Sequence, residues 1–152
     1  MHSDISNISP TFYGISLVPK NRWREYGYAL LTIAGSDGMV SDPELEWLTL
    51  DMAHEVGVDE EIVADWEDFD FEEAELEDLF AHFSSSTLAG FNKLLIYDAI
   101  RMSSADGEYA LEEKEQVYEA ARILKVQPEV VVAIEALVDL EQAANKLRMT
   151  IL

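Results

Sequence analysis

Apolar residues recur every three or four positions along most of the chain, which is the spacing of one face of an α-helix. This pattern predicts helices over residues 22–36, 42–56, 60–66, 72–83, 87–105, 111–124 and 128–149. No segment alternates apolar and polar residues in the way a half-buried strand does. The expected fold class is therefore all-α: a compact bundle of six or seven helices, with short connections that favour antiparallel neighbours.

The apolar stripes of these helices form the expected core. The last helix has the longest stripe, which we expect to face inward and which comprises Val130, Ala133, Ile134, Leu137, Leu140, Ala144 and Leu147. We also expect Trp23, Trp47 and Trp66 in the core, because tryptophan at helical spacing usually packs there. Of the histidines on helices, His54 is expected on the surface and His82 partly buried beside an apolar stripe.

Residues 1–21 show no clear period and contain Pro10 and Pro19, which restrict the residue before them to extended shapes. We interpret this segment as an N-terminal arm, either packed on the body or disordered. Residues 22–152 are long enough for one domain with a sizeable core. Two similar stretches within that domain predict half-repeats at about 22–83 and 87–149, related by an internal pseudo-twofold duplication.

One turn occurs twice in the chain. A predicted helix ends at Asp37-Gly38, and Glu44 opens the next helix seven positions after Asp37. The second copy ends a helix at Asp106-Gly107, and Glu113 follows Asp106 by the same seven positions. Glycine is the usual residue just past a helix end, because it adopts the left-handed conformation without a clash at Cβ.

The acids that recur in both copies are Asp37, Glu44, Asp106 and Glu113. Hard divalent cations prefer oxygen ligands, several of them charged, and the last turn of a helix adds unpaired carbonyl groups. If the fold brings the two turns together, these four residues could hold a divalent metal ion. The sequence does not distinguish calcium, magnesium, manganese and zinc.

Each turn matches only the second half of an EF-hand loop. With Asp37 at the fifth position, Gly38 falls at the sixth and Glu44 at the bidentate twelfth. The first and third positions would be Ile33 and Gly35, which offer no side-chain oxygen. A standard EF-hand is therefore excluded, and a site would have to pool ligands from both turns.

Helix capping is the competing interpretation of the same residues. Ser41 and Glu44 have the spacing of a capping box, which stabilises a helix by about 1 kcal/mol. Acids in the first turn of a helix also interact favourably with its dipole. Capping explains the second copy less well, because Ala110 has no side chain that can cap and Glu113 is present nevertheless.

The doubled turn, Gly35-Ser36-Asp37-Gly38 with Glu44 and Ser104-Ala105-Asp106-Gly107 with Glu113, resembles the signature of the TerB-like family of tellurite-resistance proteins. The resemblance covers about residues 22–147. It implies a compact all-helical fold with pseudo-twofold symmetry and a divalent-metal site at the paired turns. The chain departs from the family at Gly35-Ser36, where alanine usually precedes the aspartate, and in the long acidic segment Asp59–Asp78.

Charge is the extreme feature of the composition, with 31 acidic residues against 10 basic ones and a formal net charge of −21. Residues 25–92 contain no lysine or arginine. Such a surface repels phosphate backbones and anionic membranes, so we expect no nucleic-acid or membrane partner. The acidic lobe Asp37–Asp78 could instead dock a basic protein partner, or it could simply be a well-solvated surface.

The remaining motifs limit the function. The chain has no cysteine, no apolar run of transmembrane length and no signal-peptide pattern at its start, so we expect a cytoplasmic location. The sequence contains no zincin, nucleophile-elbow, P-loop or dinucleotide-binding motif, so we expect that the protein is not an enzyme. A metal-dependent hydrolase that uses the four recurrent acids of the two turns is a distant third interpretation. The function we predict is a non-enzymatic TerB-like domain that binds a divalent metal ion and acts in tellurite or metal stress. The alternative is an acidic interaction module that docks a basic partner without metal, and the oligomeric state stays open.

Overall fold

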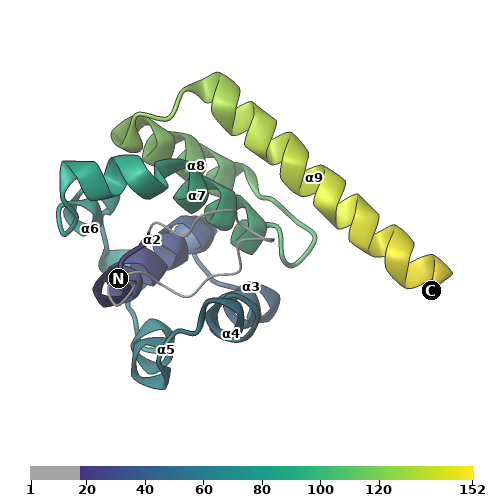
Figure 1. Ribbon diagram of the computed structural model, residues 1–152, viewed down its shortest axis with the longest axis horizontal. Coiled ribbons are helices and arrows are strands. Elements are labelled where there is room, and N and C mark those ends of the chain that lie inside the picture. Colours follow the sequence, from purple (N-terminus) through teal and green to yellow (C-terminus); the bar gives the residue numbers. More distant parts are fainter. Residues whose placement is uncertain (1–17) are drawn as a thin grey trace.

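Twelve helical segments follow one another in the computed structural model, which describes residues 18–152 and leaves out the side chain of Lys20 (Figure 1). The predicted N-terminal arm, 1–21, lies almost entirely outside these described residues. The segments are η1 (Lys20–Arg22), α2 (Trp23–Ala34), η2 (Gly35–Asp37), α3 (Asp42–Glu46), η3 (Trp47–Met52), α4 (Ala53–Val56), α5 (Glu60–Glu67), η4 (Phe71–Glu73), α6 (Leu76–Phe80), α7 (Ser85–Ser103), α8 (Leu111–Leu124) and α9 (Pro128–Ile151).

The expected all-α fold is confirmed. The segments α3, η3 and α4 join into one continuous helix over 42–56, whose middle part is π-helical, so the described chain has seven main helices and no strand. Within residues 18–152, no helix combines the length and the apolar character that crossing a bilayer requires. The division into an arm, a domain and two half-repeats stays a prediction.

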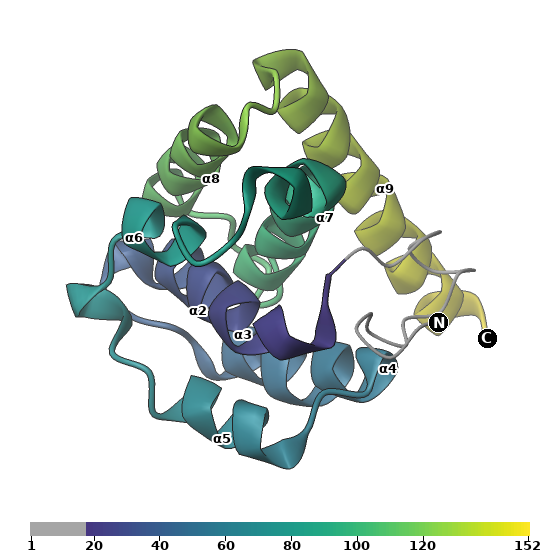
Figure 2. The same cartoon turned by 60° about the vertical axis from the view of Figure 1, so that its left-hand side comes forward.

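The centre of the molecule is α2, which packs against α5, α6, α7 and α8. In Figure 2, α5 lies below α2, whereas α6, α7 and α8 lie above it. Neighbouring segments approach α2 closely where it carries glycine. A Cβ atom on Gly27 would lie 2.1 Å from the ring of Trp66, and one on Gly35, just after α2, would lie 2.2 Å from the ring of Phe71. The Trp66 indole nitrogen also donates to the Arg24 carbonyl over 3.1 Å. These two aromatic rings therefore fasten the acidic segment to the central helix.

The single helix predicted over 72–83 was wrong, because an extended stretch divides it. Ala74 and Glu75 adopt extended backbone conformations between η4 and α6. An unbroken helix would keep one face inward, whereas the break lets Phe71 pack on Gly35 while Leu76 and Leu79 enter the core.

The core contains most of the residues that the periodicity selected. All three tryptophans are buried, as expected, and His54 is exposed, as expected. His82 is exposed rather than partly buried, because the chain leaves helical structure in this stretch, directly after α6.

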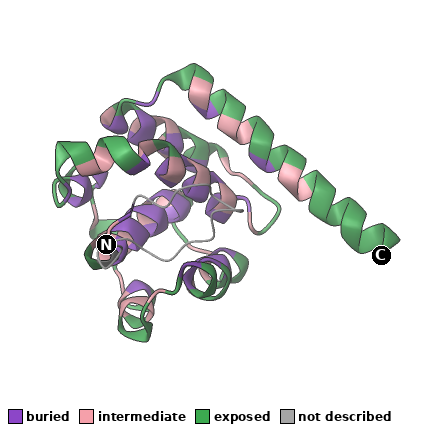
Figure 3. Ribbon diagram, in the orientation of Figure 1, coloured by how far each residue is buried: buried purple, intermediate pink, exposed green. Residues whose placement is uncertain are grey.

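The inward face of α9 differs from the predicted stripe. Only Val131 and Val138 are fully buried, with Val130 and Ile134 packed partly against the core. Leu140 is instead 68% exposed, and every residue in 143–152 is exposed. The reason is visible in Figures 1 and 3: the first half of α9 packs on the body, and the second half extends beyond it.

Candidate functional site

The two Asp-Gly turns have the same local geometry. Gly38 and Gly107 both have left-handed backbones, with φ of 104° and 88°. In each turn the aspartate Oδ1 accepts the amide of the residue two positions on, over 3.3 Å at Asp37 and 2.9 Å at Asp106. Each aspartate thus folds back onto its own turn and lies exposed at the surface.

The two glutamates close the start of the following helices. Ser41 and Glu44 form a complete capping box: the Ser41 hydroxyl accepts the Glu44 amide over 3.3 Å, and Glu44 Oε1 accepts the Ser41 amide over 2.9 Å. In the second turn Glu113 Oε1 accepts the Ala110 amide over 2.8 Å. Capping explains the second copy better than expected, because the glutamate half of a capping box needs no side chain at the first position.

Capping alone does not account for the burial of these glutamates. Glu44 is 2% exposed and Glu113 is 1% exposed, although glutamate is rarely buried completely. The fold places them together because α3 packs against α7 while α8 packs against η2 and α2, so each new helix lies on the opposite turn. Two carboxyl groups that are far apart in the sequence therefore meet in the interior.

The meeting of the two carboxyls changes their acid strength. Burial, and then the side chain of Glu44, raise the pKa of Glu113 to about 9. Burial also raises the pKa of Glu44, against the opposing effect of its hydrogen bonds. The negative charge of Asp37 adds to the rise at Glu113, and that of Asp106 adds to the rise at Glu44. The aspartate of each turn thus raises the pKa of the glutamate that belongs to the other turn.

One carboxylate oxygen of the two glutamates lacks a hydrogen-bond partner among the described residues. Glu113 Oε2 is buried and has no hydrogen-bond donor among the described residues. Its neighbour is the Glu44 carboxyl, which can bond to it only when one of the two groups carries a proton. The raised pKa of both carboxyls therefore favours one shared proton in this pair at neutral pH.

The four predicted residues divide into two kinds. Glu44 and Glu113 are brought together in the interior, whereas Asp37 and Asp106 lie at the surface beside them and bond to their own turns. Across residues 18–152, no three Asp, Glu or His side chains are arranged closely enough to hold a metal ion. The carboxyl pair could supply two ligands, and the aspartates would have to contribute through water or by turning away from their amides.

Comparison with solved structures finds a protein of similar fold. The chain resembles a tellurite resistance protein from Nostoc punctiforme with a TM-score of 0.75 and 28% sequence identity, over 92% of this chain and 86% of that one. The chain is TerB-like. No protein-family model and no curated protein matches it.

A second polar cluster of the TerB-like domain escaped the sequence analysis. Asp98 is 1% exposed in the middle of α7 and accepts the Tyr26 hydroxyl over 2.7 Å, and it pairs with Arg101 over 3.6 Å. Arg101 lies over the rings of Trp47 and Tyr97, 5.1 Å from each ring centre. An acid on the apolar face of a predicted helix is the signal that could have found this cluster, because a buried charge requires a partner.

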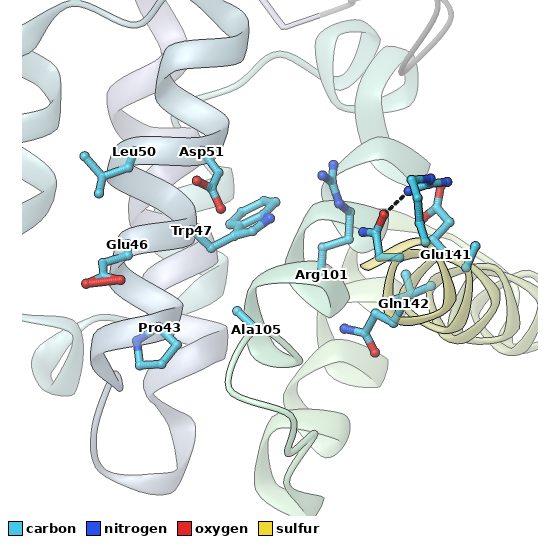
Figure 4. Close-up of a pocket in the computed structure, with 13 residues that line it drawn as sticks. Pro43, Glu46, Trp47, Leu50, Asp51, Arg101, Ala105, Glu141 and Gln142 are labelled. Atoms are coloured by element: carbon cyan, nitrogen blue, oxygen red, sulfur yellow. Dashed lines mark hydrogen bonds between the residues drawn. The ribbon is translucent and has the colours of Figure 1, made fainter. Parts of the chain in front are cut away.

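Two residues of this cluster, Trp47 and Arg101, line a cavity between the 42–56 helix and α9. The cavity has a volume of about 620 Å³, and Figure 4 shows Trp47 and Asp51 on one wall with Arg101 and Gln142 opposite. Glu141, which also lines the cavity, accepts the Tyr97 hydroxyl on both of its oxygens, over 2.7 and 2.8 Å. The lining carries both signs of charge, so the cavity favours no single class of ion.

Proposed function

We propose that this TerB-like domain binds a hard divalent cation between Glu44 and Glu113, with Asp37 and Asp106 at the rim of the site. The observation that carries the proposal is the buried Glu44–Glu113 pair with one unsatisfied oxygen. A pair of buried carboxyls must hold something positive between them, and the choice is a proton or a cation.

The chemistry of the ligands favours an ion that keeps part of its water shell. Magnesium-type sites often use one or two carboxylates and several waters, whereas calcium takes six to eight oxygens. The exposed aspartates lie where they could bond to such waters, and their negative charges would stabilise the bound cation. Cation binding would displace the shared proton.

We further propose that the cation-bound domain acts without catalysis in tellurite or metal stress. The support for this role is the likeness to a protein that is described as a tellurite resistance protein. A domain that exchanges a buried proton for a cation would report the metal level of its surroundings through its stability. A strain lacking this chain should be more sensitive to tellurite, and the Glu113→Gln variant should fail to restore resistance.

The direct experiment is calorimetric titration of the chelator-treated protein with calcium, magnesium, manganese and zinc. We expect saturable binding with a stoichiometry near one, lost in Glu113→Gln and weakened in the Asp37→Asn, Asp106→Asn double variant. Glu112→Gln is the matched control, because Glu112 is an exposed acid next to Glu113 on α8. Weak heats that are equal in all four proteins would contradict the proposal and leave the pair as a protonated capping element.

A second candidate function is supported by the acidic segment Asp59–Asp78. Eleven of its twelve acidic residues are exposed, and only Asp65 forms an ion pair with a described residue, Arg24. We propose that this surface docks a basic protein partner by electrostatic attraction, as part of the wider acidic lobe Asp37–Asp78. Like charges held this close together destabilise the domain unless a partner or salt neutralises them.

A charge-matched comparison tests this docking surface. A partner recovered by affinity capture should be lost when Glu72, Glu73 and Glu75 are changed to glutamine, and its association rate should fall as salt rises. The control variant neutralises three exposed acids elsewhere, Glu108, Glu112 and Glu115. Equal binding by both variants would contradict a specific acidic docking surface.

A further inference from the structure

Among the described residues, the second half of α9 buries no side chain in the core. Every residue in 143–152 is exposed, and Figure 3 shows this half of the helix beyond the body of the domain. An isolated helix shorter than about 12–15 residues is marginal in water. Contact with another surface would therefore stabilise this projecting half of the helix.

The exposed face of α9 has the pattern of a coiled-coil seam. Its apolar residues follow one another at intervals of four, three, four, three and four positions, and they are Ala133, Leu137, Leu140, Ala144, Leu147 and Ile151. All six are exposed; the leucines at 140 and 147 are 68% and 60% accessible. A repeat of 3.5 residues keeps one apolar line facing a partner helix of the same kind.

The body of the domain cannot cover this seam, because α9 uses a different face for the core. Val131 and Val138 are the residues of α9 that are fully buried, and they are seven positions apart on the inward side. Figure 1 shows that the helix continues in a straight line past the other elements. Within residues 18–152, Leu137, Leu140 and Leu147 of the seam stay exposed, while Ala144 at its edge also lines the cavity toward the 42–56 helix.

The distribution of charges along α9 favours a partner helix that runs in the opposite direction. The exposed acids of the first half are Glu129 and Asp139, whereas residues 143–152 carry Lys146 and Arg148 and no acid. Glu135 and Glu141 face the domain itself, where they accept the hydroxyl groups of Tyr118 and Tyr97. Two such helices that run in opposite directions place the basic half of each beside the acidic half of the other. The same arrangement puts the two bodies, each part of a chain with net charge −21, at opposite ends.

We propose that a second copy of this chain covers the seam, so that two α9 helices pair antiparallel into a dimer. Leucines at 137, 140 and 147 supply the apolar contact, and alanines at 133 and 144 let the helices approach closely. The pairing is reversible and concentration-dependent, because the seam is short and includes two small residues. It is separate from the cation site, which lies at the two Asp-Gly turns.

Sedimentation equilibrium of the full chain over a wide concentration range tests the pairing. We expect a monomer–dimer equilibrium and a helical circular dichroism signal that increases with concentration. Leu140→Glu and Leu147→Glu should each weaken the dimer by at least about tenfold, because a carboxylate would be buried in the seam. The control is Met149→Glu, since Met149 is 86% exposed and lies off the seam. A chain that stays monomeric throughout, or a dimer that tolerates both seam variants, would overturn the proposal.

Cross-linking tests the direction of the pairing, and the chain has no cysteine of its own to interfere. In the antiparallel arrangement residue 140 of one copy lies opposite residue 144 of the other. Mixing the Leu140→Cys and Ala144→Cys proteins should therefore yield the mixed disulfide in preference to either homodimer. Homodimer cross-links in preference to the mixed product would overturn the antiparallel arrangement.

Discussion

Glu44 and Glu113 are each the third residue of a helix that follows an Asp-Gly turn, and their buried carboxyls meet in the interior of the fold. Each also closes its helix by accepting the amide of the residue three positions earlier. The pair thus links the two turns electrostatically while it caps both helices. The first three predictions concern this pair.

The free energy of unfolding should fall as pH rises above neutral. The folded-state pKa of Glu113, about 9, lies above the value of about 4.3 that a glutamate has in an unfolded chain. Its contribution is fully present below the unfolded value and is lost as pH rises through the folded value. The loss is at most about 1.4 kcal/mol per pH unit. Urea denaturation at pH 6, 7, 8 and 9 measures the slope, and a flat profile in the wild type would contradict it.

Glu113→Gln should remove most of this pH dependence and keep the cap. A glutamine oxygen can accept the Ala110 amide, and its NH₂ group can donate to Glu44. Glu113→Ala should instead destabilise the domain by about 1–3 kcal/mol, because the Ala110 amide loses its acceptor. Urea denaturation of both variants at pH 7 separates these outcomes. Equal losses for Gln and Ala would show that the shared proton is not what holds the pair.

If the proposed cation binds between the two glutamates, its binding should release protons and strengthen with pH. The cation replaces the proton that the pair holds at neutral pH, so the reaction consumes the deprotonated pair. Calorimetry in two buffers with different ionisation enthalpies gives the number of protons released. A binding heat that does not depend on the buffer would place the cation away from this pair.

The buried Asp98 should be among the most sensitive positions for stability. Asp98→Ala removes the carboxylate that accepts the Tyr26 hydroxyl and pairs with Arg101, and removal of one member of a buried ion pair costs about 3–5 kcal/mol. Tyr26→Phe removes one hydrogen bond to a charged group and should cost about 1.5–3 kcal/mol. Chemical denaturation of both variants orders them. A smaller loss for Asp98→Ala than for Tyr26→Phe would show that the carboxylate is poorly accommodated in the native protein.

The close contact between Gly27 and Trp66 should exclude any larger residue at 27. A Cβ atom there would lie 2.1 Å from the indole ring, so Gly27→Ala should destabilise by about 1–3 kcal/mol in spite of alanine's better helix propensity. Trp66→Leu removes the obstructing ring at a cost of its own. In the double variant the two losses should not add, which a double-mutant cycle would detect. Full additivity would mean that the contact does not limit residue 27.

Much of the fold was predictable because the relevant interactions are local. The periodicity located the helices, and Asp37-Gly38 and Asp106-Gly107 located two of their ends, where positive φ requires glycine. Helix 72–83 could not be divided from its sequence, because the break depends on the space that Gly35 leaves for Phe71. That space is contributed by a distant part of the chain.

In the candidate site, too, the features that the sequence did not predict depend on contacts between distant parts of the chain. The repeat selected four acids by spacing alone, but it could not say that Glu44 and Glu113 would be buried while Asp37 and Asp106 stayed at the surface. That difference depends on which helix packs against which turn. The buried Asp98 was missed because the hydroxyl group that it accepts, that of Tyr26, comes from another helix far away in the sequence.

By itself the sequence determined the helices, the two equivalent turns and the acidic surface, since each follows from residues within one or two helical turns of one another. Only the tertiary structure decided which carboxyls meet, how far the pKa of Glu113 rises, and which face of α9 is left open. Periodicity shows that a helix has an apolar side, but Val138 and Leu140 are both apolar and only one of them is buried. The packing partner selects between them, and that partner comes from another part of the chain.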